Sequence, residues 1–359
     1  MRILIVTGSS GGHIFPALAL AEALNNPSHK LLLVLPQKSK EDKISSSSVE
    51  IKYIHAANLN FNLNSKNISN VFFFLQGAWQ GLRIIIKFKP DVVVGFGSLN
   101  TVALVFWAWF FRIKTVIHEQ NVIPGRANRL LSRLADKVAV SFSQTNKYLN
   151  ISPKKIVLTG NPLRSNLVRK SSQEALDFFK FKEGKFNLLI TGGSQGAQKL
   201  NSVCFEALAA LPKKDELQVI HICGAKDFAV LKEKYAGLGL SCRVFDFISE
   251  MQYAYSIAGL IICRAGASTI ADLQRFKVPA ILIPYPFAYA HQLANARILG
   301  DLKAALIISD EQLTAESLND KLQEFLEDPH KLEVMRQAYA QSKVEDAAQL
   351  LAKEVVSAF

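Results

Sequence analysis

A short apolar run followed by a glycine-rich turn occurs twice in this chain, and this repeat restricts the possible folds more than any other feature. Ile3–Val6 leads into the turn Gly8–Gly12, and Leu188–Thr191 leads into Gly192–Gly196, 184 residues later. A strand, a glycine turn and a helix open a Rossmann-like domain. A period of 184 residues exceeds the ~20–50 residues of a solenoid repeat. The sequence therefore predicts two Rossmann-like domains.

Short apolar runs alternate with helical patterns along the whole chain. We expect strands at 3–6, 31–35, 51–54, 92–94, 115–117, 138–140, 188–191, 219–223, 260–263, 280–283 and 304–308. Helical patterns include 16–24, 201–211, 269–276 and 291–299. This alternation predicts an α/β protein with parallel sheets covered on both faces.

The glycine and proline at 160–162, followed by a polar stretch at 169–174, suggest the domain boundary. We place the domains at 1–162 and 163–340. We expect one last helix at about 332–356, which can pack on either domain. The C-terminal helix at 341–359 can pack back on the first domain.

The composition is that of a globular protein, with 49% hydrophobic and 20% charged residues among 359. Disorder, collagen and a small disulfide scaffold are excluded. The formal charge of +12 suggests an anionic partner: nucleic acid, anionic lipid or a phosphorylated substrate. A non-catalytic nucleic-acid binder remains a remote alternative, because the basic residues are dispersed and no recognition motif occurs.

The four cysteines form no C-x-x-C pair, which argues against a zinc ribbon or a thioredoxin-like motif. They are Cys204, Cys223, Cys242 and Cys263. Each lies in or beside an apolar run, so we expect reduced, buried thiols in a cytosolic protein. We find neither a signal peptide nor an apolar run of the ~18 residues that span a membrane.

The first glycine turn predicts an anion site, because glycines let backbone N–H groups approach a ligand at a helix N-terminus. It matches neither the dinucleotide fingerprint nor a P-loop. His13 follows the turn where a parallel strand ends, and its ordinary pKa suits a general base. A plain strand-to-helix turn is the alternative. Gly192–Gly196 is interpreted in the same way, as a diphosphate or sugar-phosphate contact.

A polar block, His118–Asn121, follows another predicted strand. Glu119 and Asn121 could meet sugar hydroxyls. The alternative is a capping cluster for a helix near Arg126, with His118 as a hydrogen-bonded core histidine.

Two further segments combine a turn with a helix start. In Cys263–Asp272, backbone amides could hold a diphosphate and Asp272 a ribose diol. The alternative makes Ser268 a helix cap and Asp272 a first-turn acid. Farther on, Gln292 and Asn295 share one helix face and could read sugar hydroxyls, unless that face is merely solvated.

Taken together and in this order, these segments resemble the family of peptidoglycan enzymes that transfer N-acetylglucosamine from its UDP donor to lipid I, making lipid II. The resemblance covers nearly the whole chain, in Gly8–Pro16, His118–Leu134, Gly160–Arg164, Gly192–Gln198, Phe247–Met251, Arg264–Asp272 and His291–Ala296. It implies a glycosyltransferase B fold, in which two Rossmann-like domains with parallel sheets face an interdomain cleft. The first domain would meet the acceptor and the membrane, and the second would bind the UDP-sugar.

The resemblance also implies residue roles. His13 would deprotonate the acceptor hydroxyl in an inverting transfer, with Glu119 as the next candidate. Ser10, Gly11 and Gly12 would face the donor sugar and the acceptor diphosphate. Asn121 and Arg164 would contact the donor. Residues implied in binding the UDP-sugar through the second domain are Ser194, Ile248, Ala267, Ser268, Thr269, Ile270, Ala271, Asp272 and Gln292.

Some positions depart from the family's usual pattern. Ser9 and Ser10 stand where Gly and Thr are usual, and Asp272 where Glu is usual. After Gly95–Gly97 the family usually carries Gly-Tyr, whereas this chain has Ser98 and Leu99. A transferase acting on another lipid, such as diacylglycerol, is therefore the nearest alternative, and sugar-nucleotide epimerases of similar fold are more distant. No D-x-D motif occurs, so we expect neither a metal nor another cofactor.

An acceptor anchored in lipid must be met at the membrane surface. The expected contacts are Phe72, Phe73, Leu75, Trp79, Trp107 and Trp109, flanked by basic residues. Apolar surface with a basic rim suits an anionic interface. Ordinary core packing is the alternative. The resemblance implies a peripheral enzyme on the cytoplasmic face of the inner membrane, with roles in cell wall biogenesis, cell shape and division.

Overall fold

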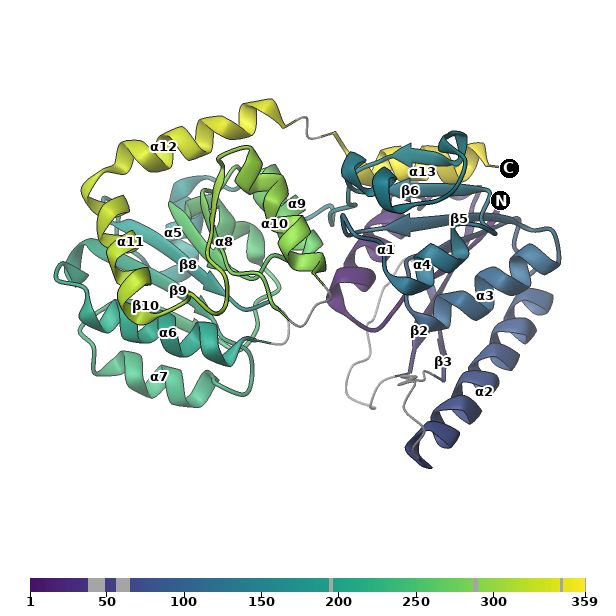
Figure 1. The fold of residues 1–359 in the computed structure, drawn as a ribbon, viewed down its shortest axis with the longest axis horizontal. Coiled ribbons are helices and arrows are strands. Elements are labelled where there is room, and N and C mark those ends of the chain that lie inside the picture. Colours follow the sequence, from purple (N-terminus) through teal and green to yellow (C-terminus); the bar gives the residue numbers. More distant parts are fainter. Residues whose placement is uncertain (38–48, 56–64, 194–195, 287–289, 343–344, 359) are drawn as a thin grey trace. The chain divides into compact units, whose positions relative to one another are not determined.

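The computed structural model describes residues 1–37, 49–55, 65–193, 196–286, 290–342 and 345–358. Two compact units make up the chain (Figure 1). The first unit is Met1–Ser165 with Glu345–Phe359, and the second is Asn166–Val344. Arg164, which lies just beyond the boundary expected from the sequence, falls in the first unit.

In each unit, every strand pairing of the sheet is parallel. The described strands of the first unit follow the order β3-β2-β1-β4-β5-β6-β7. They are β1 (Arg2–Val6), β2 (Lys30–Pro36), β3 (Glu50–Ile54), β4 (Val92–Gly95), β5 (Lys114–Glu119), β6 (Lys137–Val140) and β7 (Ile156–Leu158). The helices are α1 (Gly11–Ala23), α2 (Ser65–Phe88), α3 (Leu99–Phe110), α4 (Arg126–Leu131) and α13 (Ala347–Ser357), with short 3-10 turns η1 (Ser143–Tyr148) and η2 (Pro153–Lys155).

The described strands of the second unit follow the order β10-β9-β8-β11-β12-β13. They are β8 (Phe186–Thr191), β9 (Leu217–Ile222), β10 (Ser241–Phe245), β11 (Leu260–Cys263), β12 (Ala280–Leu282) and β13 (Ala305–Ile307). The helices are α5 (Ser172–Phe179), α6 (Gln198–Ala210), α7 (Phe228–Ala236), α8 (Met251–Ile257), α9 (Ala267–Phe276), α10 (His291–Asp301), α11 (Ala315–Glu327) and α12 (Pro329–Ala338), with η3 (Lys214–Glu216) and η4 (Tyr339–Gln341).

The apolar run of β1 explains why helices cover both faces of the first sheet. Alternate residues of a strand point to opposite faces. Ile3 and Ile5 share one buried cluster with residues of α1 and α13. Leu4 and Val6 share another with residues of α2 and α3. A run that is apolar at every position therefore needs cover on both sides, as in parallel α/β sheets generally.

The prediction of a single last helix at about 332–356 was wrong. The structure has α12 in the second unit and α13 in the first, as Figure 1 shows in yellow. Asp346 starts the new helix, because its carboxylate accepts hydrogen bonds from the N–H groups of Ala348 and Gln349 at 3.1 and 3.2 Å. Leu351 and Val355 are fully buried beside α1. Burial of such side chains, about 1.5–3 kcal/mol each, holds α13 in the first unit.

All four cysteines are free thiols. Three are buried, but Cys242 on the edge strand β10 is only partly covered, so the expectation of full burial was wrong there. An edge strand lacks a neighbour on one side, which leaves its residues more accessible than those of a central strand.

Each sheet changes winding direction at one place, between β1 and β4 in the first unit and between β8 and β11 in the second. Open α/β sheets bind ligands beyond the carboxyl ends of the strands at such switch points. The first glycine turn follows β1 and the second follows β8. The fold therefore places both turns where a ligand site is expected.

Candidate active site

His13 lies at the start of α1, beside the switch point of the first sheet. Helix α1 begins at Gly11, with Ser10 as its N-cap. The His13 Nδ1 atom is 2.8 Å from Ser10 Oγ, so the two side chains share a hydrogen bond. Burial lowers the pKa of His13 to about 4. The imidazole is therefore neutral at physiological pH and able to accept a proton.

The turn before His13 depends on the close approach of two strand ends. A Cβ on Gly8 would lie 2.8 Å from Ser98 Cβ and 3.0 Å from His13 Nδ1. Gly97, in the turn after β4, has a φ of +83°, and a Cβ there would lie 3.5 Å from His13 Nε2. His13 therefore lies close to the turns that follow β1 and β4, in the crevice where the ends of these strands meet.

Glu119 is fully buried at the end of β5, and both of its carboxylate oxygens are hydrogen-bonded. Oε1 accepts from the Asn121 N–H at 2.9 Å and from Asn121 Nδ2 at 3.2 Å. Oε2 accepts from the Gly125 N–H at 3.1 Å and from Asn128 Nδ2 at 2.8 Å. Burial raises the pKa of this carboxyl group, opposed by these bonds. Glu119 thus organises the turn before α4, as the capping alternative predicted.

His118 is a hydrogen-bonded core histidine, as the second alternative predicted. Its side chain is fully buried, with Nε2 3.0 Å from the carbonyl oxygen of Gly160 and Nδ1 3.2 Å from Gln120 Nε2. Its ring lies 5.3 Å from that of Phe96. Burial lowers its pKa to about 4. His118 therefore joins the end of β5 to the loop after β7.

In the second unit, α9 begins beside the second glycine turn, at the switch point between β8 and β11. Its N-cap is Gly266, and its first turn holds no acidic residue. The alternative that made Ser268 a cap and Asp272 a first-turn acid was therefore wrong. Ser268 Oγ is buried without a partner among the described residues. The Tyr255 hydroxyl donates to Asp272 Oδ2 at 3.1 Å, which holds that carboxylate one turn into the helix.

The remaining residues implied in donor binding occupy three places. Ile248 is buried between β10 and α8. Gln292 lies in the first turn of α10, where its Oε1 accepts a hydrogen bond from the N–H of Tyr285 at 2.9 Å. Arg164 lies over the ring of Phe15 at 4.7 Å, in the first unit. Ser194 lies outside the described residues.

Asn295 does not present its amide to a ligand as the sequence suggested. It is fully buried, and its Nδ2 donates to the carbonyl oxygen of Ala265 at 3.3 Å. This bond ties α10 to the loop that precedes α9. Sequence spacing placed Asn295 and Gln292 on one face but did not show that this face is covered.

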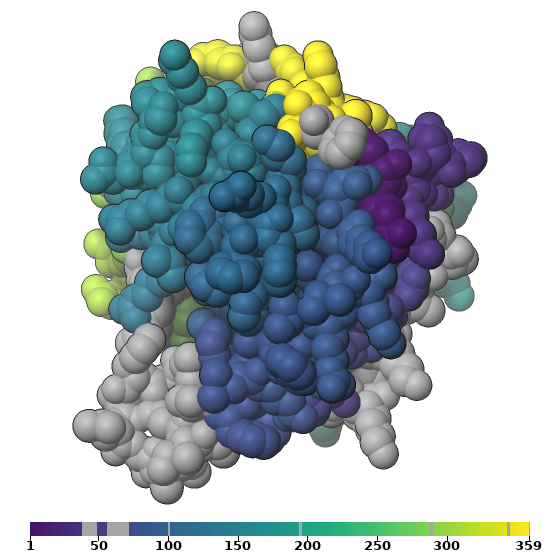
Figure 2. All heavy atoms as spheres, turned by 90° about the vertical axis from the view of Figure 1, so that its right-hand side faces the viewer, coloured from purple at the N-terminus to yellow at the C-terminus, as the bar shows by residue number. Residues whose placement is uncertain are grey.

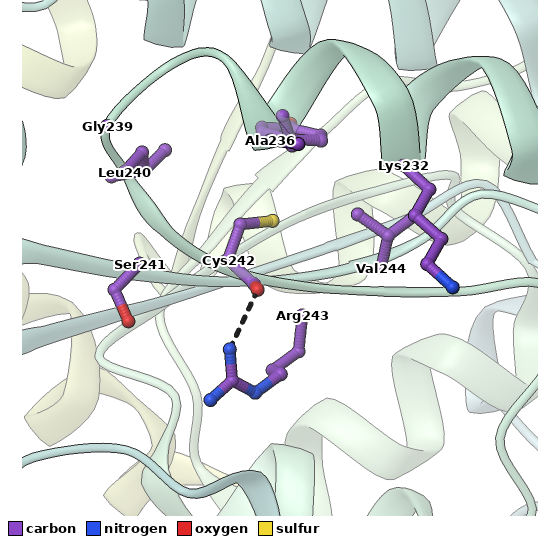
Figure 3. A pocket seen from close by; sticks show the side chains of 9 residues that line it. Lys232, Ala236, Gly239, Leu240, Ser241, Cys242, Arg243 and Val244 are labelled. Atoms are coloured by element: carbon purple, nitrogen blue, oxygen red, sulfur yellow. Dashed lines mark hydrogen bonds between the residues drawn. The ribbon is translucent and has the colours of Figure 1, made fainter.

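The second unit also has a pocket of about 410 Å³ beside the edge strand β10 (Figure 3). Lys232, Leu240, Cys242 and Arg243 are among the residues lining it. Arg243 is already engaged, donating to the carbonyl oxygens of Phe179, Cys242 and Lys180. None of the residues expected to bind substrate lines this pocket, which lies beside the edge strand β10 and not at the switch point between β8 and β11.

The apolar side chains of α2 and α3 form an exposed aromatic face on the first unit. The two helices lie side by side (Figure 1), and Figure 2 views the first unit from the side on which they lie, in blue. Phe72 and Leu75 are 64% and 60% exposed, and Phe73, Trp79 and Trp109 are also exposed. Trp107 is only partly exposed, because its Nε1–H donates to the carbonyl oxygen of Ala78 and so joins α3 to α2. The Arg83 guanidinium lies over the Trp79 ring at 5.3 Å.

Among the described residues, no helix is long and apolar enough to cross a membrane. Within the same residues, no group of three or more histidine, cysteine or acidic side chains is arranged to hold a metal ion.

Two family models match the chain. Residues 3–140 match the N-terminal domain of glycosyltransferase family 28, and residues 187–351 match its C-terminal domain. Curated relatives include the UDP-N-acetylglucosamine–N-acetylmuramyl-(pentapeptide) pyrophosphoryl-undecaprenol N-acetylglucosamine transferase of Thermodesulfovibrio yellowstonii. It is 36% identical over 98% of this chain and 99% of its own length. The Coxiella burnetii protein of the same name is 35% identical over 93% of this chain and 92% of its own.

Solved structures show the same fold. The crystal structure of Acinetobacter baumannii MurG is 29% identical, with a TM-score of 0.75 over 99% of both chains. The UDP-GlcNAc 2-epimerase of Neisseria meningitidis is 13% identical, with a TM-score of 0.70 over 99% of both chains. The epimerase likeness concerns the fold alone.

Proposed function

The chain belongs to glycosyltransferase family 28, and we propose that it transfers N-acetylglucosamine from UDP-N-acetylglucosamine to undecaprenyl-linked lipid I, forming lipid II for peptidoglycan. The observation that carries this proposal is the nearly full-length identity of 36% to a transferase named for that donor and acceptor. Both family domains are present and the fold is that of a two-unit glycosyltransferase.

We propose that the second unit binds the UDP part of the donor at the start of α9. A helix N-terminus offers free N–H groups and a positive dipole end to a diphosphate. Residues Ala267–Ala271 supply the first turn, and Asp272, held by Tyr255, accepts from the ribose hydroxyls. Ile248 would contact uracil through its backbone, and Gln292 the N-acetylglucosamine hydroxyls. Ser194, in the second glycine turn, would lie near the diphosphate.

The reaction then needs a base, and His13 is the best candidate. If its Nδ1–H donates to Ser10 Oγ, Nε2 is left with a free lone pair, and this atom lies close to Gly97. That atom would take the proton of the acceptor hydroxyl as the oxygen attacks the anomeric carbon from the face opposite UDP. The C–O bond to UDP breaks, the diphosphate leaves with the electron pair, and the configuration inverts. Backbone dipoles and Arg164 would offset the charge that develops on the leaving group.

Other groups of the first unit support this step in the proposal. Glu119 is enclosed by four hydrogen bonds, so it serves better to fix the Asn121–Gly125 turn than to take a proton. Asn121, held by Glu119, would contact the donor. Ser10, Gly11 and Gly12 would meet the donor sugar and the acceptor diphosphate through the first turn of α1.

We further propose that the protein binds as a peripheral protein to the anionic, cytoplasmic face of the inner membrane. The exposed aromatic face of α2 and α3 is the contact, since many large exposed apolar side chains on two packed helices are typical of an interaction site. The net charge of +12 adds attraction to anionic lipid. Phe72, Phe73, Leu75, Trp79 and Trp109 would enter the interface, while Trp107 would hold the two helices together.

The experiment that tests the function uses the purified full chain, UDP-N-acetylglucosamine and a lipid I analogue, with and without a chelator. We expect the disaccharide product by mass spectrometry, undiminished by the chelator. A parallel reaction replaces lipid I by diacylglycerol. Product with diacylglycerol but not with lipid I would refute the proposed acceptor and favour the alternative lipid transferase. Loss of product with the chelator would refute the metal-free route.

A further inference from the structure

Ser98 has a backbone conformation that normally requires glycine. It follows the turn after β4 and is the N-cap of α3, with φ 81° and ψ 164°. In this region of φ and ψ a side chain clashes with its own backbone. The region is therefore populated almost only by glycine, and any other residue there is strained. The hydroxyl does not offset the strain by capping, since the Ser98 side chain makes no cap hydrogen bond to α3.

The hydroxyl of Ser98 is also buried without compensation. Its Oγ has no hydrogen-bond partner among the residues that the structure describes. Serine at an N-cap usually satisfies a helix N–H, and a buried hydroxyl without a partner is destabilising. The position therefore carries two costs, in backbone strain and in desolvation, that glycine would avoid.

The place of this hydroxyl suggests a use for it. Ser98 sits at the switch point between β1 and β4, where an α/β sheet binds its ligand. Its Oγ lies 3.1 Å from the Cβ that a side chain on Gly8 would carry, and His13 Nδ1 lies 3.0 Å from the same point. Ser98 and His13 thus both lie close to the same side of Gly8.

Neighbouring side chains at this crevice also have unused hydrogen-bonding atoms. Gln120 and Asn128 are 2% and 3% exposed. Gln120 Oε1 and Asn128 Oδ1 are buried without partners among the described residues. Asn128 Oδ1 lies 3.6 Å from the Cβ position of Gly97, which also neighbours His13 Nε2. Such unpaired groups are typical of a site that is completed by a polar ligand.

We propose that Ser98 is a substrate-contacting residue, whose hydroxyl donates a hydrogen bond to an oxygen atom of the acceptor as the acceptor hydroxyl meets His13. This inference rests on the proposed function. The serine places its hydroxyl in the crevice only by adopting a strained backbone conformation, which lowers the stability of the fold. Glycine at this position would restore stability and lose the contact.

Two variants separate the hydroxyl from the strain. Ser98→Gly removes both, and Ser98→Ala removes the hydroxyl but keeps a Cβ at positive φ. One neutral hydrogen bond contributes about 0.5–1.5 kcal/mol, equivalent to about 2- to 12-fold in affinity. We expect both variants to raise the KM for the lipid I analogue by about fivefold and to leave the KM for UDP-N-acetylglucosamine unchanged. Ser98→Gly relieves the strain as well as the buried hydroxyl, so it should raise Tm by about 2–4 °C and by more than Ser98→Ala does.

Lys303→Gly is the control, because Lys303 also has a positive φ of 62° but lies in the second unit. It should change neither KM. An unchanged acceptor KM in both Ser98 variants, with active wild-type enzyme, would overturn this inference and leave the proposed function intact. So would a rise confined to the KM for the donor. A wild-type chain inactive toward lipid I would overturn both proposals.

Discussion

At the scale of single residues, the crevice of the first unit depends on how closely the ends of β1 and β4 approach. Gly8 has no side chain, which leaves room for both Ser98 and His13 beside it. His13 is then buried enough for its pKa to fall, while Ser10 fixes its ring. A glycine and a shared hydrogen bond thus determine where a neutral imidazole can meet a substrate.

Gly8→Ala should disturb this arrangement. The new Cβ would lie 2.8 Å from Ser98 Cβ, closer than real Cβ contacts. Overpacking of this kind costs about 1–3 kcal/mol. We expect a lower Tm and a loss of turnover, measured by thermal unfolding and product formation. Gly125→Ala is the matched control, since a Cβ there meets nothing within 4 Å and its φ is −62°. Equal losses in both variants would contradict the packing argument.

His13→Ala should lower kcat by about 10²–10⁴-fold, the usual contribution of a general base. Near-normal turnover would make the assignment of His13 wrong. The wild-type pH profile provides a second test. Because burial lowers the pKa of His13 to about 4, the base remains unprotonated down to about pH 5. We expect kcat/KM at pH 5.5 to stay near its value at pH 7.5. A fall in kcat/KM centred at pH 6.5 would instead indicate that a more exposed group than His13 is the catalytic base.

At the scale of elements, the sequence predicted strands better than the ends and partners of helices. Buried parallel strands are apolar at every position, so runs such as Leu260–Cys263 matched β11 residue for residue. The sequence predicted one last helix where the structure has two. The apolar pattern continues across the break, and the start of α13 depends on hydrogen bonds from its first N–H groups to Asp346. The burial of the Asn295 side chain depends on tertiary packing, which the spacing of residues within one helix does not reveal.

The candidate site shows the same division between local pattern and tertiary contact. Glycine turns at strand ends indicated His13 and the start of α9 directly. The structural role of Glu119 follows from Gly125 and Asn128, which lie 6 and 9 positions away. The strain at Ser98 comes from its positive φ, a backbone angle that the presence of a serine in the sequence does not predict.

Buried polar side chains also join β9, α6 and α7 in the second unit. His221 Nδ1 lies 2.9 Å from the hydroxyl of Tyr235, and its Nε2 lies 3.1 Å from Asn201 Oδ1. Asn201 Nδ2 in turn donates to the carbonyl oxygen of Cys223 and to Asp227. In this arrangement Nε2–H donates to Asn201, and the Tyr235 hydroxyl donates to Nδ1. The neutral ring therefore satisfies all of its partners.

This network makes the stability of the second unit depend on pH. Burial lowers the pKa of His221 from 6.5 to about 3, so between these values the unfolded chain binds a proton that the folded chain does not. Stability is therefore lost as pH falls below 6.5, by up to about 1.4 kcal/mol per pH unit. Denaturant unfolding of wild type and His221→Gln between pH 7 and 5 should show a shallower slope in the variant. Equal slopes would mean that groups other than His221 account for the loss.

At the scale of the whole molecule, charge and apolar surface have separate distributions. The basic excess is spread over the chain, whereas the exposed aromatic face is confined to α2 and α3 of the first unit. Long-range attraction to an anionic membrane depends on the net charge and weakens with salt. Insertion depends on the apolar side chains and is insensitive to salt. The two contributions to the proposed membrane binding can therefore be measured independently.

We expect the full chain to co-sediment with anionic vesicles at low salt and more weakly with neutral ones. Phe72→Ala should reduce binding to anionic vesicles by about tenfold, since a large apolar side chain contributes about 1.5 kcal/mol or more on burial. Phe178→Ala is the control, because Phe178 is also an exposed aromatic residue, 43% accessible, but belongs to the second unit. Raised salt should weaken wild type and both variants by the same factor, because none of these changes alters the charge. If Phe72→Ala and Phe178→Ala bind alike, the aromatic face does not enter the membrane, and attraction between the basic chain and anionic lipid is sufficient to explain any binding seen.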